Sequence, residues 1–444
     1  MTPTRLTASI LLALGLQAPA NAADLLDIYH AAQSQDAVFG AARAARDAGQ
    51  EKLTQGRSLL LPSVNFNANT TKNDVTTAYA PGTFLTQYSG NAQYTSHGYG
   101  VSVVQPLFRE QNWAAYNQAE LQVAISEAQY KLAEQDVILR TAQTYFDVLI
   151  AQDTVQLTAA QKSAISQQLE QAKRNFEVGT ATVTDTYEAQ ARYDLIVAQE
   201  LVSASNLEIK RRTLQQLVNG DIKDLNVLGK AFTLENPDPV DVQKWVADSQ
   251  QGNFQVIQAQ AAYELADQEV ARNRGGHLPT LDLVSNYNKN TNVGASGFNP
   301  QETHSVTVGL QLNVPLFQGG ATQSKWREAA ANREKAKQDL ENARRNVELQ
   351  TRQAYLGVVS GIAQVQALQQ ALKSSESLLE ASKLGQEVGV RTNLDVLNAQ
   401  QQAYSTRRDL YQAQYNYLLS QLRLKAAIGS LDETDLGRVN LALH

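Results

Sequence analysis

Two turns of this 444-residue chain repeat the same polar residues at the same spacing. Thr182 precedes Asp185 by three positions, and Thr392 precedes Asp395 by three positions. Each pair follows a Val-Gly dipeptide, Val178-Gly179 in the first turn and Val388-Gly389 in the second. A glycine can end a helix in the left-handed conformation, and Thr-x-x-Asp resembles a capping box that begins the next helix. An acid in the first turn of a helix also suits the positive end of the helix dipole.

The residue types that usually carry catalysis form no recognisable set in this sequence. The five histidines are scattered, and no zinc-protease, phosphate-loop or nucleophile-elbow motif occurs. The lack of cysteine excludes thiolate catalysis, iron–sulfur clusters and disulfides. With 38 Lys and Arg against 44 Asp and Glu, the chain lacks the basic surface that nucleic acids require. We therefore expect no enzymatic activity, no cofactor or metal site and no nucleic-acid partner.

The N-terminus has the form of a secretory signal peptide. Arg5 supplies a positive charge, residues 6–16 form a short apolar core, and Ala20-Asn21-Ala22 offers a cleavage site. About 11 apolar residues are too few to span a bilayer, which argues against a membrane anchor. We therefore expect residues 1–22 to be removed when the protein leaves the cytoplasm.

Long helices are predicted where proline and glycine are absent. Proline breaks helix interiors, and neither residue occurs in the runs 111–177 and 182–218. Apolar residues in the first run follow a heptad-like spacing, which is typical of coiled coils. The later half repeats this design in the runs 321–384 and 393–428, although two glycines interrupt the first of them. At about 1.5 Å per residue, the longest runs would form rods of roughly 100 Å.

Between the helical runs, apolar residues alternate with a period of two. The clearest segment spans residues 305–314, and weaker ones lie near Val64, Val101 and Leu281. Strands of about ten residues with one apolar face are typical of transmembrane β-barrels. One such segment alone would fit a soluble hairpin better. Four segments in an exported chain favour the membrane.

The chain repeats itself at an offset of about 210 residues. The two Val-Gly turns match, and residues 106–108 return as residues 315–317, Pro-Leu-Phe in both places. We expect the following order along the chain: signal peptide 1–22, first repeat 23–218, linker 219–240, second repeat 241–428 and C-terminal segment 429–444. A proline stands at the helical end of each predicted strand, and two more lie in the predicted hairpin loops: Pro62, Pro106, Pro279, Pro315, Pro81 and Pro300.

Four strands per chain are too few to close a barrel, and an open sheet edge is not stable in lipid. Barrels made of one chain begin at about eight strands. The strands of several chains must therefore be pooled, as a dimer with eight strands or a trimer with twelve. The long helices would then continue from the barrel as a second tube in the aqueous compartment.

Three motifs follow one another along this duplicated plan. They are Gly-His-Leu-Pro-Thr-Leu-Asp-Leu at 276–283, Val-Pro-Leu-Phe-Gln-Gly-Gly at 314–320 and Val-Gly-Val-Arg-Thr at 388–392. Together they resemble the TolC family of outer-membrane efflux proteins, over essentially the whole chain after the signal. The resemblance implies a mainly α-helical homotrimer, in which a twelve-stranded β-barrel in outer-membrane lipid continues into a long α-helical barrel across the periplasm. It also implies an exit duct that is joined to an inner-membrane ABC or RND-type transporter by a periplasmic adaptor protein.

The resemblance further implies a gate at the periplasmic entrance. In the family, an arginine of the second turn holds the threonine–aspartate pair of the first turn, and here these residues are Arg391, Thr184 and Asp185. A tyrosine that shares this lock falls at Gln386. We therefore expect a weaker closed state. The turns themselves, at 178–179 and 388–389, would contact the adaptor.

Two aspartate rings narrow the entrance in the family, and this chain keeps one of them. Asp395 matches the first ring, while Asn398 replaces the second. Three carboxylates in a constriction favour cations. We therefore expect cation selectivity that is weaker than two rings would give, with Asp395 acting both as helix cap and as ring.

Two other functions fit parts of the sequence. A coiled-coil scaffold in the periplasm or on the cell surface would explain the heptads and the signal, but not four alternating segments with a proline at each junction. A passive uptake porin would explain the strands, but it needs no rods of about 100 Å. An exit duct accounts for both features, with type I secretion and multidrug efflux both open as its process.

Overall fold

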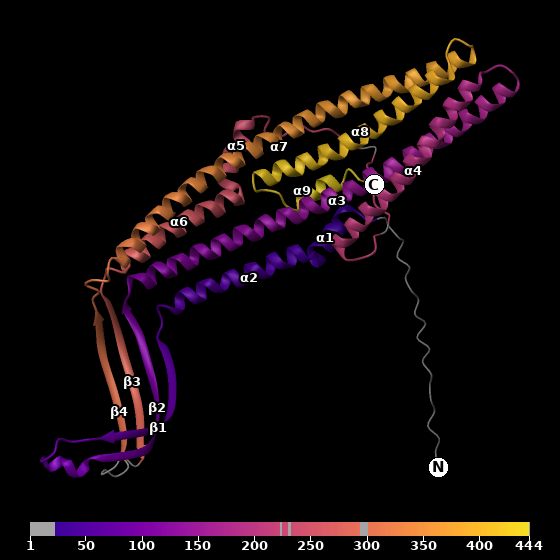
Figure 1. Cartoon of the computed structure of the whole chain (residues 1–444). Helices are drawn as coiled ribbons and strands as arrows, with labels where there is room; N and C mark the ends of the chain where they lie inside the picture. Colours follow the sequence, from indigo (N-terminus) through magenta and orange to yellow (C-terminus); the bar gives the residue numbers. More distant parts are fainter. Residues whose placement is uncertain (1–22, 223, 230–231, 294–300, 444) are drawn as a thin grey trace, which may run out of the picture.

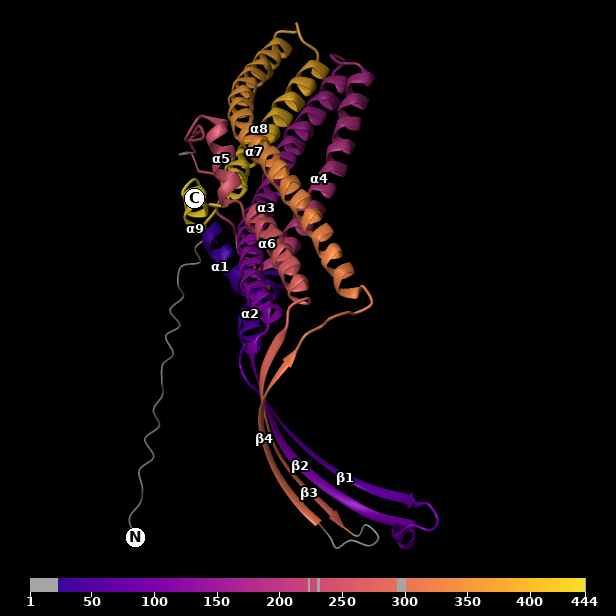
Figure 2. The ribbon, with the colours of Figure 1, turned by 90° about the vertical axis from the view of Figure 1, so that its left-hand side faces the viewer.

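The computed structural model describes residues 23–222, 224–229, 232–293 and 301–443. The predicted signal peptide and Pro300 lie outside these residues. Long helices lie side by side in an elongated body, and a narrow, curved sheet projects from one end of it (Figures 1 and 2). The chain thus divides into a helical body and a β-sheet arm.

The arm is one antiparallel sheet with the strand order β1-β2-β3-β4. Its strands are β1 (Ser63–Thr77), β2 (Gly90–Phe108), β3 (Thr280–Val293) and β4 (Gln301–Asn313). The alternating residues of β4, such as Val306 and Leu310, are exposed on one protomer, as are Val64 and Phe66 of β1. Within the described chain, β1 and β4 each have an unpaired edge. All four predicted strands are confirmed, and the sheet is open.

The prolines mark the ends of the strands as expected, with one difference. Pro62 and Pro279 directly precede β1 and β3, and Pro315 follows β4. Pro106 lies inside β2, near its helical end, where the register against β3 shifts. Proline has no N–H for the ladder, so an irregularity of this kind is where a strand tolerates it.

The body is built from two antiparallel helical hairpins (Figure 1). The first consists of α3 (Glu110–Glu177) and α4 (Val183–Val218), and the second of α7 (Ala321–Glu387) and α8 (Asn393–Ala427). The glycines of α7 do not break it. A Cβ at Gly361 would lie 3.6 Å from the side chain of Tyr417, and one at Gly357 would lie 3.6 Å from that of Ser420. Both distances are ordinary van der Waals contacts, so α7 packs against α8 at these positions, and this packing stabilises the helix through its two glycines.

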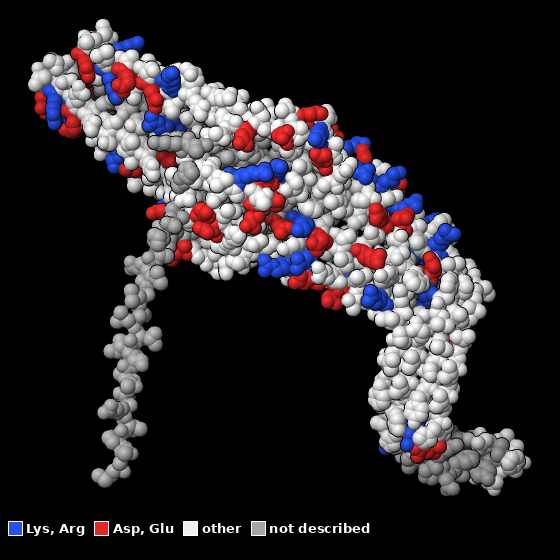
Figure 3. All heavy atoms as spheres, turned by 180° about the vertical axis from the view of Figure 1, so that it is seen from behind, with Lys and Arg blue, Asp and Glu red and all other residues white. Residues whose placement is uncertain are grey.

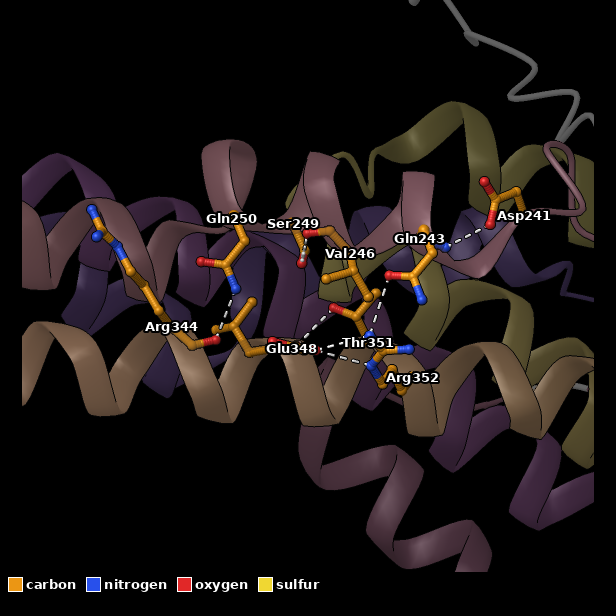
Figure 4. Close-up of polar contacts among 10 residues, drawn as sticks. Asp241, Gln243, Val246, Ser249, Gln250, Arg344, Glu348, Thr351 and Arg352 are labelled. Atoms are coloured by element: carbon orange, nitrogen blue, oxygen red, sulfur yellow. Dashed lines mark hydrogen bonds and ion pairs between the residues drawn. The ribbon is translucent and has the colours of Figure 1, made fainter.

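Shorter helices support the hairpins. They are α1 (Leu25–Gln35), α2 (Ala37–Ser58), α5 (Val242–Gly252), α6 (Phe254–Gly275) and α9 (Glu433–Asn440), and the 3₁₀-helix η1 (Phe84–Tyr88) lies between β1 and β2. Polar contacts hold α5 to α7 (Figure 4). Gln250 Nε2 donates to the Arg344 carbonyl at 3.0 Å, and Arg352 Nη2 donates to Gln243 Oε1 at 3.3 Å. The start of the second half is thereby fixed against its long helix.

The main core lies where the two hairpins and the short helices meet. Phe146 of α3 stacks on Tyr415 of α8 with ring centroids 5.5 Å apart. Tyr417 Oη donates to the carbonyl of Glu235 at 2.9 Å, which ties the inter-repeat segment to this core. Toward the turns only small apolar clusters remain, such as Ile165, Ile196 and Leu397. Segments with few buried apolar contacts open at low free-energy cost, so we expect local opening to begin at the hairpin tips.

The charged side chains are spread over the helices and nearly absent from the length of the sheet on the face in Figure 3. A sheet surface without charges is the kind that lipid tolerates. Among the described residues, no helix is both long and apolar enough to cross a membrane.

Candidate functional site at the hairpin tips

The first turn has the capping geometry that its sequence predicts. Gly179 has φ +78°, and Thr182 is the N-cap of α4. The Asp185 N–H donates to Thr182 Oγ1 at 3.3 Å, and the Thr182 N–H donates to Asp185 Oδ2 at 2.8 Å. Two free N–H groups at the helix start are thus satisfied reciprocally. The capping box is confirmed.

The second turn is nearly a copy of the first. Gly389 has φ +80°, the Asp395 N–H donates to Thr392 Oγ1 at 3.2 Å, and the Thr392 N–H donates to Asp395 Oδ2 at 2.9 Å. The backbone hydrogen bond from Thr392, together with that from its hydroxyl, lowers the pKa of Asp395. Asp395 is therefore a carboxylate at neutral pH, so it carries the charge that a selectivity ring needs while it caps α8.

The predicted gate residues do not meet within one subunit. In the described chain, Arg391 makes no hydrogen bond or ion pair with Thr184 or Asp185, and its Nη1 lies 3.9 Å from Asp395 Oδ1 in its own turn. Thr184 is exposed, as is more than half of the Arg391 side chain. Gln386 Nε2 donates to Asn393 Oδ1 at 3.3 Å, which ties the end of α7 to the start of α8. The exposed side chains of Arg391 and Thr184 are therefore accessible to another molecule.

Asn398 has a partner that the sequence did not reveal. Arg192 of α4 donates through Nη2 to Asn398 Oδ1 at 2.9 Å and through Nη1 to Gln401 Oε1 at 2.7 Å. Asn398 and Gln401 are three residues apart and share one face of α8. The spacing of the two amides was visible in the sequence, but nothing there identified which cation of another helix would reach them.

Nearer the core, a partly buried carboxyl also joins the hairpins. Tyr415 Oη of α8 donates to Asp153 Oδ2 of α3 at 3.1 Å. Burial raises the pKa of Asp153 to about 6, and the hydrogen bond from Tyr415 opposes this rise. The carboxyl therefore titrates in a range that is unusual for aspartate.

The described residues show no arrangement typical of catalysis. No group of three His, Asp or Glu side chains among them is placed to hold a metal ion. A cavity of about 560 Å³ lies beside α9 and has a mixed lining, with Trp245 and Leu422 among its apolar residues and Lys425 and Asp435 among its polar ones. The polar residues that stand out are those of the tips and of the seam between the hairpins.

The open four-stranded sheet and the paired helical hairpins define a subunit of a trimeric channel-tunnel, in which pooled strands form a barrel and long helices continue it. Solved structures with this fold include the Campylobacter jejuni outer membrane channel CmeC and the open state of the Neisseria gonorrhoeae outer membrane channel MtrE. CmeC superposes with a TM-score of 0.79 at 16% identity and covers all of this chain and 97% of its own. MtrE gives 0.75 at 19% identity over 92% of this chain and 90% of its own.

The family follows from the sequence comparison. The outer membrane efflux protein model matches residues 28–220 and 245–430, so the chain belongs to the outer membrane efflux protein family. It is 33% identical to the outer membrane protein TolC of Vibrio cholerae, over 95% of this chain and 94% of that protein. It is 34% identical to the alkaline protease secretion protein AprF of Pseudomonas aeruginosa, over 95% and 87% respectively. The protein is an outer-membrane exit duct whose helical body lies in the periplasm, and the scaffold and porin alternatives are set aside.

Proposed function

We propose that the duct exports proteins delivered by an inner-membrane transporter, as the last stage of type I secretion. The observation that carries this proposal is the distribution of relatives. AprF and the proteases secretion protein PrtF of Dickeya chrysanthemi are 34% and 31% identical over 95% and 94% of this chain. The efflux protein BepC of Brucella suis is 24% identical over 76%. Protein secretion is therefore favoured over efflux of small molecules.

The secretion proposal is tested in a bacterial host that lacks its own outer-membrane duct. The chain is expressed with a protease-secreting ABC transporter and its periplasmic adaptor, and protease activity is measured in the medium. Secretion that depends on this chain supports the proposal. Restored dye efflux through an RND-type pump without any protease secretion would contradict it.

The exposed Val178, Val388 and Val390 at the tips support adaptor contact at the turns.

We further propose that the tips form a closed mouth in which Arg391 contacts Thr184 and Asp185 of a neighbouring subunit. Two facts support a contact between subunits. The three residues lie on tips that carry little apolar core, and Arg391 and Thr184 are exposed in one subunit. Three Asp395 carboxylates in the mouth would make it cation-selective. The division of the chain into two repeats, with a linker at 219–240 and a C-terminal segment from 429, stays a prediction.

The gate is tested by single-channel conductance of the purified trimer in planar bilayers, with a salt gradient to measure selectivity. Arg391→Ala and Asp185→Ala should raise the conductance, because each removes one partner of the link. Asp185→Asn keeps an oxygen for the Thr182 cap and separates loss of the charge from loss of the cap. Lys383→Ala is the control, since the one ion pair of Lys383 among the described residues is with Glu380, within α7. Unchanged conductance in both alanine variants would refute the proposed contact between subunits.

Selectivity is measured in the same bilayers. Asp395→Asn retains an oxygen that can accept from Thr392, so α8 stays capped while the negative charge is lost. We expect the reversal potential to move toward zero. Asp409→Asn, which removes a charge paired with the adjacent Arg408, should leave the reversal potential unchanged. Equal selectivity of the Asp395 variant and the wild type would mean that Asp395 is only a cap.

A further inference from the structure

Side-chain hydrogen bonds join the two hairpins of a subunit at three levels. Going along α8 toward its tip, Arg423 Nη2 donates to Gln143 Oε1 at 2.9 Å, Tyr415 Oη donates to Asp153 at 3.1 Å, and Asn398 and Gln401 accept from Arg192. Among the described residues, the Arg192 contact is the outermost of these links. Beyond it, the two turns carry only hydrogen bonds within their own hairpins.

The packing around Arg192 is thin, so its hydrogen bonds matter more there than they would in the core. Ile165, Ile196 and Leu397 form the only buried apolar cluster of the described residues that joins α3, α4 and α8 at this level. A cavity of about 140 Å³ lies beside them and is lined by Arg192, Ile196, Leu397 and Gln401. Arginine presents its N–H groups in a rigid planar fork, which suits two oxygens one helical turn apart.

The same contact brings positive charge close to Asp395. Asn398 follows Asp395 by three residues in α8, a rise of about 4.5 Å on the same helix face. In each subunit, a guanidinium bound at Asn398 therefore lies about one helical turn from the Asp395 carboxylate of that subunit. Opposite charges at this range offset each other's field in the surrounding solution.

We propose that Arg192 is a second latch of the periplasmic mouth, which holds α8 against α4 within each subunit and, through its charge, weakens the cation selectivity set by Asp395. This inference rests on the proposed gate at the tips. It differs from the Arg391 link in two respects: it acts inside one subunit, and it couples mouth opening to ion selectivity through one side chain.

The test uses the purified trimer in planar bilayers. Arg192→Gln should raise the open population about five- to 150-fold, the range expected for losing two hydrogen bonds of about 0.5–1.5 kcal/mol each, and it should increase cation selectivity. Asn398→Ala removes only the hydrogen bond from Arg192 Nη2 and leaves the one to Gln401, so it should raise conductance less than Arg192→Gln does. Adding Asn398→Ala to Arg192→Gln should change the conductance little. Arg192→Lys keeps the charge but loses the fork, so conductance should rise while selectivity stays at the wild-type value.

Arg408→Gln is the matched control. Arg408 lines the same small cavity but pairs with the adjacent Asp409 on α8 at 2.9 Å, so its removal changes local charge without breaking a link between hairpins. Wild-type conductance in Arg192→Gln and Asn398→Ala, alongside an opened Arg391→Ala channel, would overturn the latch and leave the gate intact. Wild-type conductance in all three would overturn the gate itself. If Arg192→Gln does not assemble, Arg192→Lys and Asn398→Ala decide the question.

Discussion

Asp153 makes the stability of the helical body depend on pH in a direction opposite to that of most aspartates. Its pKa is raised from 3.8 to about 6 in the folded protein, because burial disfavours the carboxylate. The folded state therefore binds more protons than the unfolded state between about pH 4 and pH 6. Stability is lost as the pH rises through this window, and the loss is complete above pH 6.

The size of the loss follows from the shift. One pKa unit corresponds to about 1.4 kcal/mol, so the shift from 3.8 to about 6 gives at most about 3 kcal/mol per subunit. Asp153 is only partly buried, so screening by water reduces this to roughly 1–2 kcal/mol. Asp153→Asn is neutral at every pH and can still accept from Tyr415 Oη. We expect the variant to be more stable than the wild type at pH 7.5 and equal to it near pH 4.

The assay is thermal unfolding of the detergent-solubilised trimer, followed by circular dichroism at one fixed scan rate at pH 4, 5, 6 and 7.5. The advantage of Asp153→Asn should grow between pH 4 and pH 6 and then stay constant. Tyr415→Phe is the complementary variant, because it removes the donor that favours the carboxylate, and its stability deficit should be larger at pH 7.5 than at pH 4. A gain from Asp153→Asn that is the same at all four pH values, or absent at pH 7.5, would refute the assignment.

Two further predictions concern packing and assembly. A Cβ at Gly49 would lie 2.2 Å from Ser126 Oγ, so Gly49→Ala should lower the free energy of unfolding by about 1–3 kcal/mol. Ser126→Gly relieves this clash but places a glycine inside α3, so it should recover only part of the loss. Gly40→Ala on the same helix as Gly49, where nothing lies within 4 Å, should instead raise the free energy of unfolding by about 0.5–1 kcal/mol, and chemical denaturation distinguishes the two variants. Asp282 is only 6% exposed, and Arg109→Ala removes the two hydrogen bonds that its carboxylate accepts from Arg109 Nε and Nη2. We expect the free energy of unfolding to fall by about 2–3 kcal/mol and fewer trimers to resist sodium dodecyl sulfate on gels. Wild-type resistance would contradict this prediction.

The sequence predicted most elements because proline, glycine and periodicity set them locally. The run 182–218 became α4 from Val183 to Val218, and the run 393–428 became α8 from Asn393 to Ala427. Both capping boxes were visible because all their atoms come from four consecutive residues. The predicted run 321–384 became α7 from Ala321 to Glu387. Its two glycines lower helix propensity, but packing of α7 against Tyr417 and Ser420 of α8 offsets that cost, and propensity alone does not record such packing.

The contacts between hairpins were not predictable in the same way. Arg192 reaches Asn398 across 206 positions of sequence, and Tyr415 reaches Asp153 across 262. Which faces of two long helices meet depends on their relative rotation, and many polar residues of each helix would have served equally well as partners. The roles of Asp395 and Arg391 came from family resemblance, and only the capping role of Asp395 is visible in a single subunit.

The unpaired edges of β1 and β4 have a genetic consequence. No subunit can close the barrel alone, and the trimeric duct contains three copies, each of which must function. When a defective and a normal copy are made in equal amounts and mix freely, only about one duct in eight is wholly normal. Mutations that impair the function of the hairpin tips but still allow assembly should therefore behave as dominant. Mutations that reduce assembly, such as those at the Arg109–Asp282 pair, should be recessive.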